Sequence, residues 1–442
     1  MPRPRQTPAV VRRPRARPSA ASTSRTPSRS PVKAFFNVVT TAEARARIAA
    51  FAPVERTTVR VADALGRVLA RDLAAVVDLP HFHRANMDGY AVRAADTFGA
   101  SASIPAYLRL TGTVEMGVAA TRPVGKGEAV RISTGGMLPP GADAVVMVEY
   151  TEEVGDGTVE LHRGVAPWDN VLRVGEDIAR GSLVFRAGRR LRARDLGALA
   201  GIGITRVPVY RCPRVALVST GDEIVAPDRT PGPGQVRNIN AYSLRAMATE
   251  AGAEVKDYGV CRDDRATLRR VLGLALRGHD AVLISGGSSV GAKDMTLEVI
   301  GSFPRSEVLF HGISIAPGKP TILARAADRP VLGLPGHPQS ALVIFELFGA
   351  PLLRVLGGED PATVFEPARV TRARLVENVA SQPGREDYVR VVLEVRDGHR
   401  CAVPLAGKSG AIFNLVQADG LVRIPAAAEG LDAGVEVDVL LL

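Results

Sequence analysis

The most informative segment of the chain reads Asp280-Ala-Val-Leu-Ile-Ser-Gly-Gly-Ser-Ser-Val-Gly-Ala-Lys-Asp294. Its apolar run, Ala281–Ile284, and the glycines behind it predict a buried strand that ends in a loop able to hold an anion. Glycine lets backbone N–H groups approach a phosphate closely, and three serine hydroxyls add donors: Ser285, Ser288 and Ser289. Asp294 follows this loop, and a carboxylate beside a phosphate site commonly serves a metal ion. On this segment alone, an ordinary strand–loop–helix turn is an equally good interpretation.

The surrounding pattern alternates strands with helices. Val215-Ala-Leu-Val-Ser-Thr-Gly-Asp-Glu223 is typical of a buried strand that runs into a turn, and residues 243–251 and 268–276 have helical patterns. Residues 255–260 again resemble a strand. This alternation predicts a parallel α/β sheet with ligands at the carboxyl ends of its strands.

Segments rich in β-strand patterns lie on both sides of this α/β region. Short strands and turns fill residues 108–160, and strand patterns return after Gly358. We therefore predict an α/β multidomain protein. Its expected parts are a disordered basic tail (1–33), a helical and extended connecting domain (34–74 and 182–212), a β-rich inserted module (75–181), an α/β domain (213–360) and a C-terminal small β-barrel (361–442).

Composition indicates a soluble globular protein. The chain has 442 residues, of which 46% are hydrophobic and 23% charged, and its formal net charge is +10. Nine of the 56 basic residues and no acid lie in residues 1–33, so the remainder holds 47 bases against 46 acids. The globular part is therefore nearly neutral, which argues against nucleic acid as a partner.

The tail is rich in Pro, Ser and Arg and lacks apolar periodicity, so we expect it to be disordered. It also lacks the apolar core of a secretory signal, although an organelle transit peptide and a weak nucleic-acid arm remain alternatives to a solubilising extension. Cys212, Cys261 and Cys401 are scattered, which fits the reducing cytoplasm and neither zinc nor a disulfide framework. No run of about 18 uninterrupted apolar residues occurs, so no membrane span is expected.

Several short motifs occur in a specific order. They are Met87-Asp-Gly-Tyr-Ala91, Gly175-Glu-Asp177, Ser219-Thr-Gly-Asp-Glu223, Gly286-Gly-Ser-Ser-Val-Gly291 with Asp294, Pro317-Gly-Lys-Pro320 and Gly333-Leu-Pro-Gly-His-Pro338. Each motif is weak alone, but the ordered set strongly resembles molybdopterin molybdenumtransferase, the MoeA family that includes the E domain of gephyrin. The resemblance covers about residues 36–442 and implies that the α/β domain binds molybdopterin.

The resemblance implies that molybdate is inserted into adenylylated molybdopterin with release of AMP in a Mg²⁺-dependent reaction. The implied catalytic residues are Asp88, Asp177, Glu223, Asp263 and Asp294, of which Glu223, Asp263 and Asp294 would hold Mg²⁺. The implied substrate-binding residues are Ser219, Thr220, Gly221, Asp222, Ser285, Gly286, Gly287, Ser289, Gly291, Pro317, Gly318, Lys319, Pro320, Pro335, Gly336, Arg390 and Ser409.

Family resemblance also implies a homodimer in the cytoplasm, in which Asp88 and Asp177 complete the cleft of the partner's α/β domain. It implies molybdopterin adenylyltransferase as a second partner. Two other functions remain alternatives: the adenylyltransferase of the preceding step, which shares the α/β fold, and a gephyrin-like scaffold without catalysis. One departure stands out, because relatives commonly carry a basic residue where this chain has Ala316.

Overall fold

The computed structural model describes residues 37–286, 290–367 and 369–442, and for residues 290–294 it describes the backbone only. The predicted tail (1–33) and two predicted site residues, Gly287 and Ser289, lie outside the described residues. Gly291 and Asp294 fall in the part described by its backbone alone.

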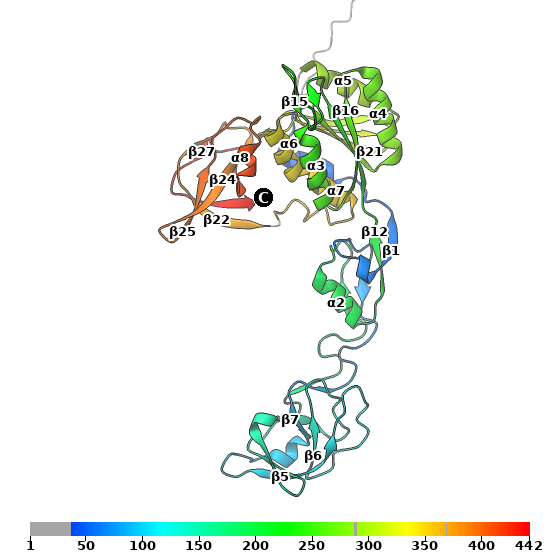
Figure 1. The fold of residues 1–442 in the computed structure, drawn as a ribbon, viewed down its shortest axis with the longest axis vertical. Helices are drawn as coiled ribbons and strands as arrows, with labels where there is room; N and C mark the ends of the chain where they lie inside the picture. Colours follow the sequence, from blue (N-terminus) through cyan, green and yellow to red (C-terminus); the bar gives the residue numbers. More distant parts are fainter. Residues whose placement is uncertain (1–36, 287–289, 368) are drawn as a thin grey trace, which may run out of the picture. The chain divides into compact units, whose positions relative to one another are not determined.

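A six-stranded sheet forms the centre of the α/β domain, in the order β16-β13-β17-β21-β20-β18 (Figure 1). Its strands are β13 (Arg214–Thr220), β16 (Glu254–Cys261), β17 (Ala281–Gly286), β18 (Glu307–His311), β20 (Ile322–Ala326) and β21 (Arg329–Leu334). The first four strands in spatial order run parallel to one another. β20 runs antiparallel to both of its neighbours, β21 and β18. A tight turn at Ala327 and Asp328, both with positive φ, joins β20 directly to β21 and leaves no length for a crossover helix.

Helices cover both faces of this sheet. They are α3 (Ile239–Glu250), α4 (Arg265–Gly278), α5 (Val290–Gly301), α6 (Pro338–Ile344) and α7 (Ala350–Leu356). Along β13, Val215 and Leu217 pack into one core with α3, α6 and α7, whereas Ala216 and Val218 pack into another with α4 and α5. Alternate side chains of a strand point to opposite faces, so a continuous apolar strand supplies two cores at once.

The helical stretch Pro338–Leu356 has a π-helical turn in its middle, at Phe345–Gly349. Pro351 lacks the N–H that an α-helix needs there and its ring would clash with the carbonyl four residues earlier, which explains the wider turn just before it. This stretch is the one candidate membrane span in the described part of the chain, by length and a hydropathy of 1.5, but 83% of its window is buried inside the protein. Such burial is typical of a core helix.

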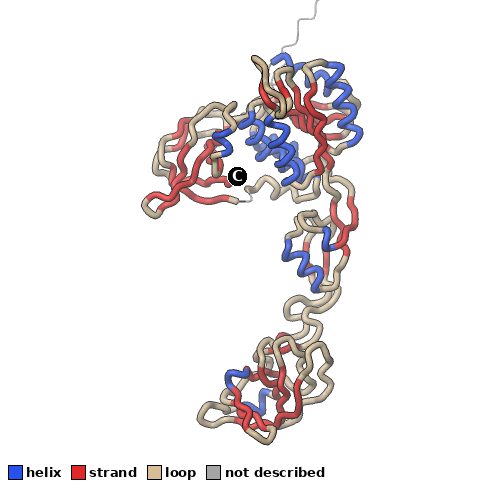
Figure 2. The backbone as a smooth tube through the Cα atoms, viewed as in Figure 1, coloured by secondary structure: helices blue, strands red, loops and turns tan. Residues whose placement is uncertain are grey.

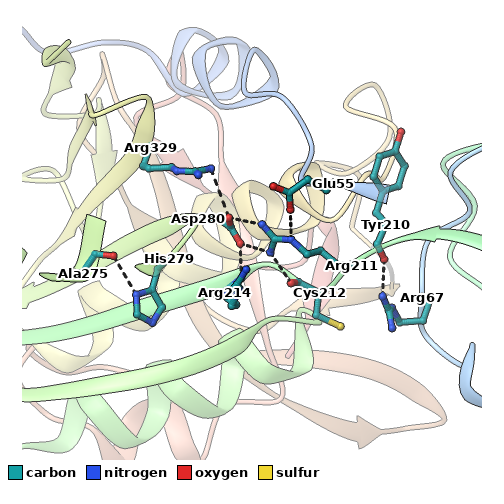
Figure 3. A network of polar contacts seen from close by, with 10 residues as sticks. All are labelled: Glu55, Arg67, Tyr210, Arg211, Cys212, Arg214, Ala275, His279, Asp280 and Arg329. Atoms are coloured by element: carbon teal, nitrogen blue, oxygen red, sulfur yellow. Dashed lines mark hydrogen bonds and ion pairs between the residues drawn. The ribbon is translucent and has the colours of Figure 1, made fainter. Parts of the chain in front are cut away.

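A buried carboxylate joins the start of β17 to the strand that enters the α/β domain (Figure 3). Asp280 accepts hydrogen bonds from Arg211 Nη1 and Nη2 at 2.5 and 2.6 Å and from the Arg214 backbone N–H at 2.8 Å. Arg329 lies 3.5 Å from the same carboxylate. Burial alone would raise the pKa of Asp280, but the hydrogen bonds from Arg211 and from the Arg214 N–H, together with the charges of Arg211 and Arg329, outweigh it and lower that pKa. The paired charge therefore fixes the end of the sheet opposite the strand carboxyl ends.

In the region before the α/β domain, strands early in the sequence pair with strands late in the sequence. Antiparallel pairs join β1 (Arg56–Arg60) to β12 (Arg206–Tyr210), β2 (Leu73–Ala74) to β11 (Leu183–Phe185) and β3 (Arg84–Ala85) to β10 (Val171–Leu172). Its helices are α1 (Thr41–Ala49), which Thr40 and Glu43 begin with a capping box, α2 (Ala193–Gly201) and the short η1 (Val61–Asp63). The chain segment between β3 and β10 is thus an insertion between paired strands.

Strands dominate that insertion and the C-terminal domain (Figure 2). The insertion holds a sheet of β4 (Gly89–Val92), β5 (Ala106–Thr113), β6 (Glu128–Ile132), β7 (Ala144–Met147), β8 (Thr151–Val154) and β9 (Thr158–Leu161), with η2 (Ala94–Thr97) and η3 (Val148–Tyr150). The C-terminal domain contains β22 (Val370–Leu375), β24 (Glu386–Arg396), β25 (His399–Pro404), β26 (Gly420–Ile424) and β28 (Glu436–Leu441), with β23 (Val379–Ala380), β27 (Gly430–Leu431) and α8 (Phe413–Val416). Pairing of β24 with both β25 and β26 closes a barrel, as predicted. The short β19 (Ile315–Ala316) of the α/β domain adds to β24.

Candidate active site

A cleft of about 310 Å³ lies at the carboxyl ends of β13 and β17. These neighbouring parallel strands pair Ser219 with Ser285 and Thr220 with Gly286, so their last residues lie side by side. Six predicted site residues line it: Ser219, Thr220, Glu223, Ser285, Gly286 and Gly336. A second cavity of about 320 Å³, next to Arg45, contains none of the predicted site residues. The strand-end cleft is therefore the candidate site, because parallel sheets bind ligands at that edge.

Two glycines allow the close packing around this cleft. Gly286 has φ +125°, and a Cβ there would lie 2.1 Å from the Thr220 carbonyl oxygen. Gly318, in the predicted Pro317–Pro320 loop, has φ +116°, and a Cβ there would lie 2.2 Å from Ile344 Cγ1. A larger residue would require movement of the backbone at Gly286 and movement of the Ile344 side chain at Gly318, and the positive φ disfavours it at both positions.

Acidic side chains gather in the turn after β13 and after β16, where Glu223 lines the cleft and Asp222 and Asp263, which do not line it, lie close to one another. The Asp263 N–H lies 3.3 Å from Asp222 Oδ1. Partial desolvation, followed by the charges of Asp222 and Glu223, raises the pKa of Asp263. Mutual repulsion of this kind and an all-oxygen ligand set suit a hard divalent cation such as Mg²⁺. Within the described residues no three acidic, His or Cys side chains are already arranged to hold a metal, so this set fits Mg²⁺ only in part.

The other two predicted acids lie in or beside the inserted module. Asp88 Oδ1 accepts hydrogen bonds from the Thr134 N–H at 2.6 Å and from its hydroxyl at 2.9 Å, and these bonds lower the pKa of Asp88. Asp177 is exposed in the turn that follows β10. Neither residue is among the described residues that line the cleft. The structure of one chain thus does not bring these two acids to the strand-end site.

Arg390 on β24 is a half-buried cation without an acidic partner among the described residues. Its Nη2 donates to the carbonyls of Leu405 and Gly407, each at 3.3 Å, and its Nε is buried without a hydrogen-bond partner. Burial lowers the pKa of Arg390. An unpaired buried guanidinium is unfavourable unless an anion binds to it, so this arginine is a candidate oxyanion ligand.

The loop that contacts Arg390 continues into the strand-end cleft. Ser409 Oγ lies 2.8 Å from His337 Nδ1, and the Ser409 carbonyl accepts from the Gln339 N–H at 3.2 Å. His337 and Gly410 both line the cleft. Lys319, the basic residue of the Pro317–Pro320 loop, is exposed. Ser409 is therefore linked to the cleft through His337, a residue that the sequence analysis quoted in a motif without giving it a role.

Sequence reasoning also missed two asparagines at the start of α3. Asn238 caps α3, and its Nδ2 donates to Ser219 Oγ at 2.9 Å. Asn240 Nδ2 donates to Ser285 Oγ at 2.8 Å and to the Gly336 carbonyl at 3.0 Å. The sequence did contain a signal for these two residues. It is the polar Asn-x-Asn pair at the start of a helix that follows a strand-end turn.

Comparison with known proteins matches almost all of the described chain to one family. Residues 39–203 match the MoeA N-terminal region (domain I and II), residues 216–355 a probable molybdopterin binding domain and residues 372–442 the MoeA C-terminal region (domain IV). The chain belongs to the MoeA family. Its relatives include the molybdopterin molybdenumtransferase of Bacillus subtilis, which is 34% identical over 393 residues covering 88% of this chain and 90% of the relative.

Solved MoeA structures agree with this assignment. A molybdopterin biosynthesis MoeA protein from Pyrococcus horikoshii has 40% sequence identity and a TM-score of 0.74, covering 91% of this chain and 99% of that one. A second MoeA structure from the same organism has 30% identity and a TM-score of 0.79, covering 92% and 100%. The α/β domain, the inserted module and the barrel thus form a MoeA fold.

Proposed function

We propose that the strand-end cleft of this MoeA protein holds the phosphate of adenylylated molybdopterin while molybdate is inserted and AMP is released. The chain is a molybdopterin molybdenumtransferase of molybdenum cofactor biosynthesis, with molybdopterin and molybdate as substrates. The observation that carries the residue assignments is that acidic and basic side chains without partners of opposite charge lie at different places around the cleft. Acids with mutual repulsion lie on one rim, and an unpaired arginine contacts the loop that forms another.

The proposed Mg²⁺ would be held by Glu223, Asp263 and Asp294. When bound, the ion supplies positive charge that stabilises the phosphate oxygens as AMP leaves. Asp222 lies close enough to Asp263 to raise its pKa, which supports the placement of a cation on this rim. The cleft serines Ser219 and Ser285 would donate to the phosphate from the other side.

Molybdate is a dianion, and we assign its binding to Arg390 with Ser409 and Lys319. Arg390 offers a planar set of N–H donors that suits a tetrahedral oxyanion, and its Nε is already buried without a partner. The short pairing of β19 with β24 places the chain that leads into the Pro317–Pro320 loop next to the strand that carries Arg390. Lys319 is the basic residue of that loop, since Ala316 carries no charge.

We further propose a homodimer in the cytoplasm, with the adenylyltransferase of the preceding step as a transient partner. The acids divide between the inserted module and the α/β domain, and the cleft of one chain contains neither Asp88 nor Asp177. Mixing an Asp88→Ala chain with an Asp294→Ala chain should restore one intact site per heterodimer. If the mixture stays inactive although heterodimers form, the acids are not shared between chains.

The two alternative functions are not favoured. The family matches at residues 39–203 and 372–442 lie outside the α/β domain that an adenylyltransferase shares. A scaffold without catalysis has no need for charges that repel one another beside a cleft.

The direct test incubates the purified chain with adenylylated molybdopterin, molybdate and Mg²⁺ and measures AMP. We expect AMP release that depends on all three additions. Consumption of ATP with molybdopterin, and no AMP release from the adenylylated substrate, would overturn the assignment in favour of the preceding step.

A further inference from the structure

Two serine hydroxyls at the cleft are each held by an asparagine side chain. Ser219 and Ser285 are register partners on β13 and β17, and both line the cleft. Asn238 Nδ2 donates to Ser219 Oγ and Asn240 Nδ2 donates to Ser285 Oγ, at 2.9 and 2.8 Å. The serines are 2% and 3% exposed and both asparagines are 8% exposed, so rotation of these side chains into solvent is restricted.

The orientation of both carboxamides is fixed by a second hydrogen bond. Asn240 Nδ2 also donates to the Gly336 carbonyl at 3.0 Å, and a carbonyl can only accept. Asn238 Oδ1 accepts from the Ala241 N–H at 3.3 Å, and a backbone N–H can only donate. Each amide therefore turns its N–H toward a serine oxygen, and exchange of its oxygen and nitrogen would break a backbone contact.

A hydroxyl that accepts from an amide has its own proton left to donate. Among the described residues, neither Ser219 nor Ser285 has an acceptor for that proton. Neighbouring strands lie about 4.8 Å apart, so two such protons can converge on the oxygens of one phosphate. The buried Asn240 Oδ1 also has no partner in the described part of the protein, and because it can only accept, a substrate N–H or O–H could satisfy it but the phosphate could not.

We propose that Asn238 and Asn240 are positioning residues that convert Ser219 and Ser285 into paired O–H donors for the substrate phosphate. The asparagines act through the serines and need no contact with the phosphate themselves. This inference rests on the proposed function, since it names the residues that orient the phosphate-binding groups of that site.

A double-mutant cycle tests the Asn240–Ser285 pair. The measured quantity is the dissociation constant of adenylylated molybdopterin for Asn240→Ala, Ser285→Ala and the double variant. Loss of one hydrogen bond to a charged group predicts weakening of roughly 10-fold for each single variant. Because Asn240 acts through Ser285, Asn240→Ala in the Ser285→Ala background should add less than about twofold.

Asn238 and Ser219 provide a second cycle with little effect on folding. Asn238→Ser retains a side-chain oxygen that can cap α3 but cannot reach Ser219, so it removes the donor and adds no charge. Tyr242→Ala, an exposed substitution on the same helix, is the matched control and should leave the dissociation constant unchanged. We also expect KM to rise more than kcat falls, because the phosphate contact is made in the bound substrate.

Effects that multiply in both cycles would overturn the inference, because they would show that the asparagines act independently of the serines. In that outcome the wild-type chain still releases AMP and the proposed function stands. If the wild-type chain neither binds nor turns over the adenylylated substrate, both the function and the inference fail.

Discussion

Replacement of Arg390 by methionine separates a binding role from a structural role. Arg390 donates only two long hydrogen bonds, both to carbonyls, and its Nε is buried without a partner in the described part of the chain. A cation in this state contributes little to folding and is unfavourable to bury. Methionine has a similar length and no charge, so we expect the midpoint of thermal unfolding to stay unchanged or to rise.

The same substitution should weaken molybdate binding strongly. A hydrogen bond to a charged group contributes about 1.5–3 kcal/mol, and partial exposure of Arg390 to solvent favours the lower half of that range for each bond. One lost bond then gives about 1.5–2.3 kcal/mol, which corresponds to a roughly 10- to 50-fold increase in the molybdate concentration for half-maximal AMP release, and loss of a second bond increases it further. Arg390→Lys keeps the charge without the planar set of donors, so its effect should be smaller.

Arg396 on the same strand provides the control. It is exposed and paired with Glu394 at 2.7 Å, so Arg396→Met should change neither stability nor the molybdate requirement. Half-saturation by adenylylated molybdopterin should be nearly unaffected in both variants. An Arg390→Met chain that unfolds several degrees lower, or that needs no additional molybdate, would refute the assignment of this arginine to the oxyanion.

Three further predictions concern the basic loop, the sheet and the tail. Lys319→Ala should raise the molybdate concentration for half-maximal turnover and Ala316→Lys should lower it, by roughly 5- to 100-fold, the value of one charged hydrogen bond; an unchanged requirement in Ala316→Lys would show that this position does not contact molybdate. Asp280→Ala should cost about 1–3 kcal/mol in urea unfolding at pH 7, because it leaves Arg211 with only the exposed Glu55 as an acidic partner and removes the acceptor of the Arg214 N–H. Since the folded pKa of Asp280 is lowered, its contribution is present above the unfolded value of about 3.9 and is lost as pH falls through the folded pKa, so the variant should show less acid destabilisation than the wild type. Removal of residues 1–33 should leave turnover unchanged, and a drop in AMP release would reveal a role for the tail.

Strong local patterns explain why much of the fold was predictable. The first four residues of β17, Ala281–Ile284, are all apolar and the strand ends in glycine, a pattern that is typical of a strand buried on both faces. The barrel was predicted from alternating strands near the C-terminus. By contrast, the antiparallel pairing of β20 with β21 depends on a tight turn at Ala327 and Asp328, which contains none of the glycines that mark most two-residue hairpin turns.

The site was predictable where it depends on motifs and not where it depends on tertiary contacts. Motif glycines such as Gly286 have conformations and close contacts that the sequence pattern anticipates. Asn240 belongs to no quoted motif, and its role depends on Ser285 and Gly336, which lie 45 and 96 residues away in the chain. No local pattern encodes such contacts, and the predicted helix began only at residue 243, after both asparagines.

Charged side chains without partners of opposite charge lie at two places in the described part of the protein, near Asp263 and at Arg390. In the unliganded chain, partial burial and then the charges of Asp222 and Glu223 raise the pKa of Asp263, and burial of Arg390 lowers its pKa, so both groups are held in unfavourable surroundings. A cation would offset the repulsion at Asp263, and an oxyanion would pair with Arg390. Each ligand would therefore bind the folded chain more tightly than the unfolded one. Ligands that bind only the folded state raise stability by RT ln(1 + [L]/Kd), about 2.7 kcal/mol at one hundred times Kd. Charge that a fold leaves unpaired is therefore a physical reason to look for a ligand at that place.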